Sequence, residues 1–242
     1  MSHRVRKIAG TLAAIAFVLV LIPVSSILVT SWYSRWEASR LLAAARTIRP
    51  GISTEAETRQ TLSQFERYVS HGHEEISFHS RYSINARDSY DVPNYPDWVS
   101  HVAPHLPDWI NEHIWFLPYT SFSVSPWFKN GQLIVLEFRE MQPRRDGIHP
   151  YAAIVRVFST STEMDVPELP GDFTGFHVSH IQEVQVDENG KHIGSAWMSR
   201  QYISLDERAS PEQFARSFNF NLSCLTSLLG CDDARKILAD TE

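Results

Sequence analysis

The chain has 242 residues, of which 43% are hydrophobic and 21% are charged, a composition ordinary for a folded domain. Its formal net charge is −6, and because Arg4, Arg6 and Lys7 contribute three positive charges, the rest of the chain carries −9. An acidic domain argues against a nucleic-acid partner and against broad adhesion to anionic lipid, since both need a basic surface.

The first predicted element is a transmembrane helix over residues 8–31, after a cytoplasmic tail of residues 1–7. The helical stretch holds no charged side chain, and about 20 apolar residues are enough to span the hydrocarbon core of a bilayer. Trp32, Tyr33 and Trp36 follow at once, as aromatic anchors at the far interface would. The sequence therefore predicts a single-pass membrane anchor.

A cleaved signal peptide is the alternative for the same stretch. Val24 and Ser26 are suitably placed for the small residues of a cleavage site. The apolar run is longer than the roughly 7–15 residues of a signal peptide's hydrophobic core, so the uncleaved anchor is the preferred interpretation.

The orientation of the anchor is argued from the charges beside it. Basic residues favour the cytoplasmic side of a membrane, and three of them precede the apolar run. Arginines also follow the run, so the count of basic residues does not decide the orientation alone. A short charged tail would have to cross the membrane if the domain were cytoplasmic. We therefore expect the inner, cytoplasmic membrane as the location, with the N-terminus inside and the domain extracytoplasmic.

A single domain is predicted after the anchor. Residues 32–50 are rich in Ala, Leu and Arg, which favour helix, and are interpreted as a helical stalk. Residues 51–242 then form one extracytoplasmic domain, which is long enough for one core.

The first helix of this domain is marked by its capping residues. Thr54 and Glu57 have the spacing of a capping box. They predict a helix over residues 55–70, which Gly72 is placed to end.

Most of the domain has the pattern of short strands joined by tight turns. Asn130-Gly131 between two alternating apolar runs is a strong signal for a β-hairpin, and Asn189-Gly190 marks a second one. Strands joined in this way favour an antiparallel sheet. The predicted strands cover residues 75–84, 119–128, 132–141, 151–158, 181–186 and 192–203.

The C-terminal part is predicted to be an amphipathic helix. Ser210 and Gln213 form a capping box, and an apolar stripe runs from Phe214 to Leu229, after which Gly230 would end the helix. Such a stripe must be buried, most simply on the sheet. The predicted fold class is α+β: an N-terminal transmembrane helix, then a twisted antiparallel β-sheet packed by an N-terminal and a C-terminal amphipathic helix.

Cys224 and Cys231 are the only cysteines of the chain. Along a straight helix, this separation corresponds to about 10 Å, which is too far for a disulfide. If Gly230 turns the chain back, the two side chains can meet, and in an oxidising compartment a single pair is more often bonded than free. We therefore expect a disulfide, with two buried thiols as the alternative.

The sequence holds no recognised catalytic, cofactor-binding or metal-binding motif, so no catalytic residue and no cofactor is predicted. Two histidines and a carboxylate can hold zinc, and His177, His180 and Asp172 are the weak candidates for such a site. The preferred interpretation of these histidines is a surface or hydrogen-bonding role.

Four tryptophans are close together in the sequence, at Trp98, Trp109, Trp115 and Trp127. Exposed tryptophans could form a binding surface for a glycan or a peptide by stacking. Tryptophans more often fill a core, since each buries about 150–250 Å². Core packing is the preferred interpretation and a binding surface is the alternative.

The C-terminal run FNFNLSCLTSLLGCDDARKIL resembles a signature of uncharacterised bacterial membrane-anchored proteins. The pattern Asn-Leu-x-Cys-Leu-Thr-x-x-x-Gly-Cys matches residues 221–231 here. The resemblance is specific over this short run and otherwise covers only the layout of the chain. It implies an N-terminal anchor with a single extracytoplasmic domain, and it implies no particular activity.

Together these features predict a non-catalytic protein of the cell envelope. The anchor, the acidic domain and the lack of catalytic motifs favour a domain that binds another protein or a cell-wall component such as a glycan. The alternative is an envelope hydrolase with a His-based site that a metal could assist.

Overall fold

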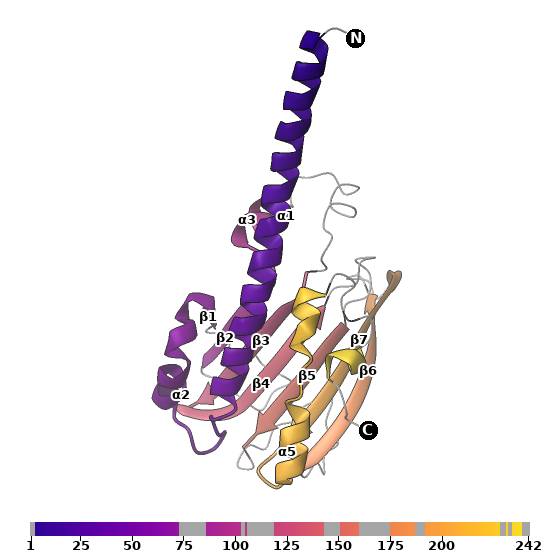
Figure 1. The fold of residues 1–242 in the computed structure, drawn as a ribbon. Coiled ribbons are helices and arrows are strands. Elements are labelled where there is room, and N and C mark those ends of the chain that lie inside the picture. The colour runs from indigo at the N-terminus through magenta and orange to yellow at the C-terminus, as the bar shows by residue number, and fades with distance from the viewer. Residues whose placement is uncertain are drawn as a thin grey trace.

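The computed structural model describes the chain in several stretches, which Figure 1 shows as a ribbon. The described residues are 3–72, 86–102, 105, 119–142, 151–159, 175–186, 192–227, 231 and 234–238. Within these stretches, side chains are described except at 3–16, 19, 20, 100, 151, 180–186, 192–200, 234 and 235. The strand predicted at residues 75–84 lies outside the described residues, as do Trp109, Trp115 and Asp172.

A seven-stranded sheet forms the centre of the described fold, which is α+β as predicted. Its strands lie in the order β1-β2-β3-β4-β5-β7-β6. All neighbours pair antiparallel except β5 and β7, which are parallel. The strands are β1 (Val69–Gly72), β2 (Ala86–Pro93), β3 (Ser121–Lys129), β4 (Gln132–Gln142), β5 (Tyr151–Phe158), β6 (Phe176–Val186) and β7 (His192–Leu205).

The parallel pair β5–β7 corrects the prediction of a purely antiparallel sheet. Strand β6 follows β5 in the chain but lies at the edge of the sheet, and β7 returns between them. Alternation within a strand indicates which residues share a face, but it carries no information about which strand becomes the neighbour. The order of β6 and β7 is therefore a tertiary property that the strand pattern does not contain.

The hairpin predicted around Asn130 and Gly131 is confirmed. These residues have φ of 53° and 74°, and Lys129 pairs with Gln132 on either side of them. Positive φ at both central residues is typical of a type I′ turn, whose twist matches that of the two strands. Strand β5 coincides with its predicted residues, and β6 and β7 pair as the second predicted hairpin.

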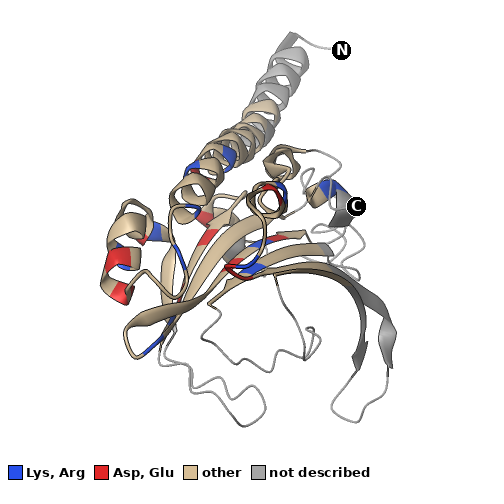
Figure 2. Ribbon diagram, turned by 90° about the horizontal axis from the view of Figure 1, so that it is seen from below, with Lys and Arg blue, Asp and Glu red and all other residues tan. Residues whose placement is uncertain are grey.

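The helices that pack on the sheet lie on one of its faces (Figure 2). Apolar side chains from this face form one core with α1 and with the C-terminal part of the chain. The helices are α1 (His3–Ala45), α2 (Glu55–Leu62), the 3-10 helix η1 (Ser63–Tyr68), α3 (Asp97–Val102), α5 (Pro211–Ser217), the 3-10 helix η3 (Leu222–Thr226) and α6 (Ala234–Ile237).

Helix α1 is continuous, and its second half belongs to the domain. Residues 32–50, predicted as a stalk, contribute five apolar side chains to the core, which are Ala38, Leu41, Leu42, Ala45 and Ile48. The spacing of Ala38, Leu41, Leu42 and Ala45 places these four on one face of α1, and Ile48 follows just after the helix ends. The domain therefore begins within α1, before the boundary predicted at residue 51. Among the residues that the structure describes, no helix has both the length and the apolar character needed to cross a membrane.

The capping box of α2 is confirmed, but the helix is shorter than predicted. The Glu57 backbone N–H donates to the Thr54 hydroxyl at 3.2 Å, and the Thr54 N–H donates to the Glu57 carboxylate at 2.9 Å. The α-helix ends at Leu62 and tightens into η1. Val69 and Gly72 then lie in β1, because pairing with β2 suits a β-branched valine better than a further helical turn.

The C-terminal helix is also shorter than predicted. Its capping box of Ser210 and Gln213 is present, but α5 ends at Ser217 and Phe220 forms a β-bridge with Leu238. Tertiary pairing thus overrides the helical pattern of the sequence. Two apolar residues of the predicted stripe are nevertheless buried in the core, Phe218 and Leu225.

Cys224 and Cys231 form the predicted disulfide, and their Cα atoms are 5.4 Å apart. The backbone N–H of Cys231 donates to the side-chain oxygen of Gln142 on β4 at 2.6 Å. On α1, the Arg46 guanidinium donates to the backbone carbonyl of Phe218. The C-terminal segment is thereby attached both to the sheet and to the N-terminal helix.

Candidate functional site

The sheet face opposite the helices carries a row of polar residues that crosses six strands. Each member lies opposite the next across neighbouring strands, from β2 through β3, β4, β5 and β7 to β6. The hydroxyl groups of the first two members lie 3.1 Å apart. We call these residues the polar row: Ser89, Ser125, Glu137, Arg156, Ser204 and His177.

Glu137 is the centre of the polar row and is almost completely buried. The Nε atom of Arg156 donates to Oε2 of its carboxylate at 2.7 Å. Near the other oxygen, Oε1, the Nη2 atom of Arg139 lies at 3.2 Å and that of Arg87 at 3.6 Å. Three guanidinium groups from three different strands therefore surround one carboxylate.

The ionisation of Glu137 depends on these neighbours. Burial alone would raise the pKa of its carboxyl. The positive charges of Arg156, Arg139 and Arg87 outweigh burial and hold the pKa below its ordinary value. Glu137 is therefore ionised in the folded protein at neutral pH, and its buried charge is paired, as burial of a charge requires.

Two of the guanidinium groups also lie over aromatic rings. The Arg156 guanidinium lies 5.0 Å from the ring centroid of Tyr202 and 5.9 Å from that of Trp127. The Arg87 guanidinium lies 5.1 Å from the same Trp127 ring. Cation–π contacts of this kind contribute about 0.5–1 kcal/mol at exposed sites and more where water is excluded. The cluster is therefore a fixed arrangement of charges.

A second row lies beside the polar row and reaches solvent. Asp91, Ser123 and Arg139 face one another across β2, β3 and β4. Burial raises the pKa of the Asp91 carboxyl, although a hydrogen bond from Ser121 and the charge of Arg139 act against it. The Arg139 side chain is 36% exposed. This second row thus presents partly exposed carboxyl, hydroxyl and guanidinium groups that can exchange hydrogen bonds with a polar ligand.

Glu140 lies on the other face of β4, in the apolar core. It is completely buried, and within the described structure neither of its carboxyl oxygens has a hydrogen-bond partner. Its cross-strand neighbours are Phe122 and Ala153. Burial raises the pKa of this carboxyl well above its ordinary value, since an apolar site disfavours the charged form.

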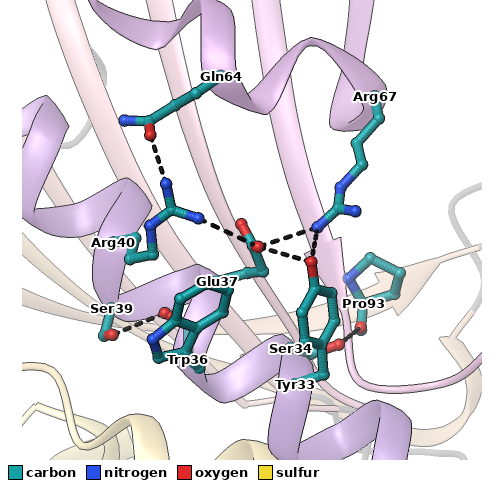
Figure 3. A network of polar contacts seen from close by, with 9 residues as sticks. All are labelled: Tyr33, Ser34, Trp36, Glu37, Ser39, Arg40, Gln64, Arg67 and Pro93. Carbon is teal, nitrogen blue, oxygen red and sulfur yellow. Dashed lines mark hydrogen bonds and ion pairs between the residues drawn. The ribbon is translucent and has the colours of Figure 1, made fainter.

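A second candidate region surrounds α1 where the helix leaves the domain. We call Trp32, Tyr33, Arg35, Trp36 and Arg40 the collar. Figure 3 shows the contacts of the collar around Glu37, a buried carboxylate. It accepts a hydrogen bond from the Tyr33 hydroxyl at 2.8 Å and lies 3.0 Å from Nη2 of Arg67 and 3.4 Å from Nη1 of Arg40.

The same contacts connect α1 to two other elements. Arg40 donates to Gln64 of η1 at 2.5 Å, and the Ser34 hydroxyl donates to the backbone carbonyl of Pro93 on β2 at 2.6 Å. The Arg40 guanidinium also lies 4.6 Å from the Trp36 ring centroid, and that of Arg35 lies 5.7 Å from the Trp32 ring. The collar is therefore built on a part of α1 that is fixed to the domain.

The weak metal candidates do not share a face of the sheet. Position 177 on β6 pairs with Ser204, and position 180 pairs with Gln201. Positions three apart in a strand belong to opposite faces, so positions 177 and 180 do not share a face of the sheet. Among the described residues there is no group of three or more His, Cys, Asp or Glu that could hold a metal ion.

The two described tryptophans of the candidate binding surface lie in different places. Trp127 is buried on the polar face between guanidinium groups. Trp98 packs against Ile27 of α1, together with Tyr95 and Val99. They do not form one stacking surface, and the preferred interpretation as packing residues fits both.

Apart from His177, the residues of the polar row were not among the site residues predicted from sequence, and neither were the contacts of the collar with Glu37. The sequence does contain a signal for a polar face. Ser121, Ser123 and Ser125 alternate with apolar residues, and an apolar residue likewise separates Glu137 from Arg139. The cross-strand register that aligns these positions is a tertiary feature. No comparable signal indicates that Glu37 would be buried.

Comparison with protein families, with curated proteins and with solved structures found no match to this chain. The resemblance of residues 221–231 to a signature of membrane-anchored proteins therefore stays a prediction.

Proposed function

We propose that the chain is a single-pass membrane protein of the cell envelope, related to the membrane-anchored proteins that its C-terminal signature resembles. Residues 8–31 cross the cytoplasmic membrane with the N-terminus inside. The domain lies outside the cytoplasm and binds a protein or a cell-wall component without chemical turnover.

The observation that carries this proposal is the exposed apolar surface of α1. The helix extends far beyond the sheet (Figure 1). On the part beyond the core, seven large apolar or aromatic side chains are 42–68% exposed: Phe17, Val18, Leu21, Ile22, Val29, Trp32 and Tyr33. Soluble proteins seldom leave so large an apolar surface in water, whereas lipid is a suitable solvent for it.

The collar supports the same proposal. Trp and Tyr side chains gather at the interface between membrane and water, where an apolar ring and a polar edge are both accommodated. Arginine can extend its guanidinium toward the headgroups while its methylene stem stays in apolar surroundings. The collar combines both residue types directly after the apolar run.

We expect the double variant Val18→Arg/Ile22→Arg to lose membrane association. Each arginine near the middle of a spanning helix costs about 2.5–3.5 kcal/mol in insertion. The measurement is the fraction of full-length protein that stays with membranes after an alkaline carbonate wash. Ile52→Arg is the matched control, because Ile52 is 74% exposed and follows α1. Retention of the double variant at the level of this control would contradict the anchor.

The side of the membrane is supported by the basic residues of the short N-terminal tail and by the disulfide. Disulfides persist outside the cytoplasm and are rare within it. Maleimide labelling of cells that express the full-length protein tests the orientation. A maleimide mass tag should label Cys224 and Cys231 only after reduction. Labelling of both thiols without reductant would place the domain in the cytoplasm.

The binding function is supported by the polar face of the sheet. Asp91, Ser123 and Arg139 are partly exposed hydrogen-bonding groups on this face, and the ion pair with the buried Glu137 holds Arg139 in place. Such preorganised groups reduce the ordering that accompanies binding of a polar ligand. The hydrolase alternative has no comparable support, since positions 177 and 180 belong to opposite faces.

We expect Arg139→Gln to reduce capture of the partner about tenfold, since a hydrogen bond to a charged group contributes roughly 1.5–3 kcal/mol. The measurement is cross-linking in intact cells, followed by purification and mass spectrometry. Arg216→Gln is the matched control, because Arg216 is exposed on α5 over the other face. Equal capture by both variants would remove the polar face from the binding site, and a domain that captures nothing yet turns over a substrate would overturn the binding function.

A further inference from the structure

Helix α3 contacts α1 near the end of the proposed membrane span. Helix α3 packs against α1 at Ile27 through Val99 and the neighbouring Tyr95. The indole N–H of Trp98 donates to the Ser26 hydroxyl at 3.3 Å. Figure 1 shows α3 beside α1, between the sheet and the N-terminal end of the helix. This part of the domain is therefore level with the end of the apolar run.

The depth of this contact follows from helix geometry and rests on the proposed anchor. At a rise of 1.5 Å per residue, the helix from residue 8 to Ile27 is about 28 Å long. The hydrocarbon core of a bilayer is about 30 Å thick. If residue 8 lies at the inner boundary, Ile27 lies at the outer one, and α3 lies beside it at the level of the headgroups.

The side chains exposed at this level suit that environment. On α1 they are Leu28, Val29, Trp32, Tyr33 and Trp36, and on the domain they are Val102 and Tyr119, each 36–68% exposed. Tyr119 contacts the buried Tyr95 ring edge to face, with the centroids 6.0 Å apart. Apolar and aromatic side chains from two parts of the chain are thus exposed over the first turns of α1 beyond Ile27 and on the neighbouring part of the domain.

The contact of α3 with α1 is held in place, because α1 continues without interruption from Ile27 into the core of the domain. One continuous helix runs from His3 to Ala45. Its second half is buried in the core, and the contacts of Glu37 and Ser34 fix it to η1 and β2. The part of α1 from Ser26 onward therefore belongs to the same unit as the domain, and Pro23 lies just before it.

We infer that the domain rests directly on the outer surface of the bilayer, with the Val102 end of α3 in the lipid headgroup region. The occupant of this surface is lipid, because the surface is continuous with the apolar side of α1 and lies at the depth where the hydrocarbon core ends. The sheet is thereby held close to the membrane surface.

The test measures the depth of spin labels on full-length protein in phosphatidylcholine nanodiscs. Single cysteines are introduced as Val102→Cys, Ile52→Cys and Ile22→Cys, and they are labelled without reductant so that the native disulfide stays closed. Collisions with oxygen report lipid, and collisions with a nickel chelate report water. We expect the label at 102 to lie within about 5–10 Å of the headgroup boundary, and the label at 52 to lie in water.

Each outcome has a distinct meaning. If the label at 22 contacts lipid while the label at 102 is as open to nickel as the label at 52, the anchor stands and the docking of α3 is wrong. If the label at 22 is also open to nickel, the anchor itself is wrong. A label at 102 shielded from both reagents would show that protein covers this surface, which overturns lipid as its occupant.

Discussion

Replacing Glu137 with glutamine is expected to lower the free energy of unfolding of the domain by about 3–5 kcal/mol. The amide removes the negative charge that pairs with the buried guanidinium of Arg156 and with Arg139 and Arg87. For a chain of this size, the melting temperature should fall on the order of 10 °C. The measurement is thermal and denaturant unfolding of the purified full-length protein.

The matched control for this variant is Glu212→Gln on α5. Glu212 also pairs with an arginine, but both side chains are well exposed, and pairs of this kind contribute little. The control should stay within about 0.5 kcal/mol of the wild type. Equal, small effects of both variants would contradict a buried charge cluster that holds the sheet together.

The pH dependence of Glu137 has a definite sign. Its pKa is lower in the folded protein than in the unfolded chain. Its contribution to stability is therefore present above the unfolded pKa and is lost as the pH falls through the folded pKa. The difference in unfolding free energy between wild type and Glu137→Gln should shrink as the solution is acidified.

Replacing Glu140 with leucine is expected to stabilise the domain by about 1–3 kcal/mol. The carboxyl is buried without a hydrogen-bond partner in the described structure, so an apolar side chain of similar size avoids its desolvation. Unfolding of the full-length protein near neutral pH measures the effect. Glu66→Leu is the control, because Glu66 is exposed on η1.

The stability change of Glu140→Leu should also depend on pH. The pKa of Glu140 is raised in the folded protein, so the wild type is most stable below the unfolded pKa, where the carboxyl is protonated in both states, and it loses stability as the pH rises through the folded pKa. The wild type should lose stability over this range relative to the leucine variant. A variant that is less stable than the wild type, or a difference that does not change with pH, would show that the carboxyl has a partner in the core.

Local signals predicted individual elements well. The turn at Asn130-Gly131 predicts the β3–β4 hairpin because two adjacent residues supply the required positive φ. The capping boxes at Thr54 and Ser210 mark the starts of α2 and α5 for the same reason, since each is complete within four residues. Such elements depend on neighbours in the chain.

Features that depend on distant residues were not predictable in this way. Leu41 and Leu42 look like part of a stalk until the sheet that covers them is known. The helical stripe after Phe214 is interrupted because Phe220 pairs with Leu238. The same holds for the candidate site, because Glu137 acquires its three arginines only when β2, β4 and β5 come into register.

The attachment of the C-terminal segment to α1 determines when folding can finish. Arg46 donates to the Phe218 carbonyl, and Leu225 and Ile237 share a core with Leu41. Because synthesis proceeds from the N-terminus, α1 must wait for almost the entire chain before its apolar side is covered. Contacts over such long sequence separations form slowly. Truncation shortly after β7 would therefore leave an open core, which makes the nascent domain a natural client for chaperones until its last residues emerge.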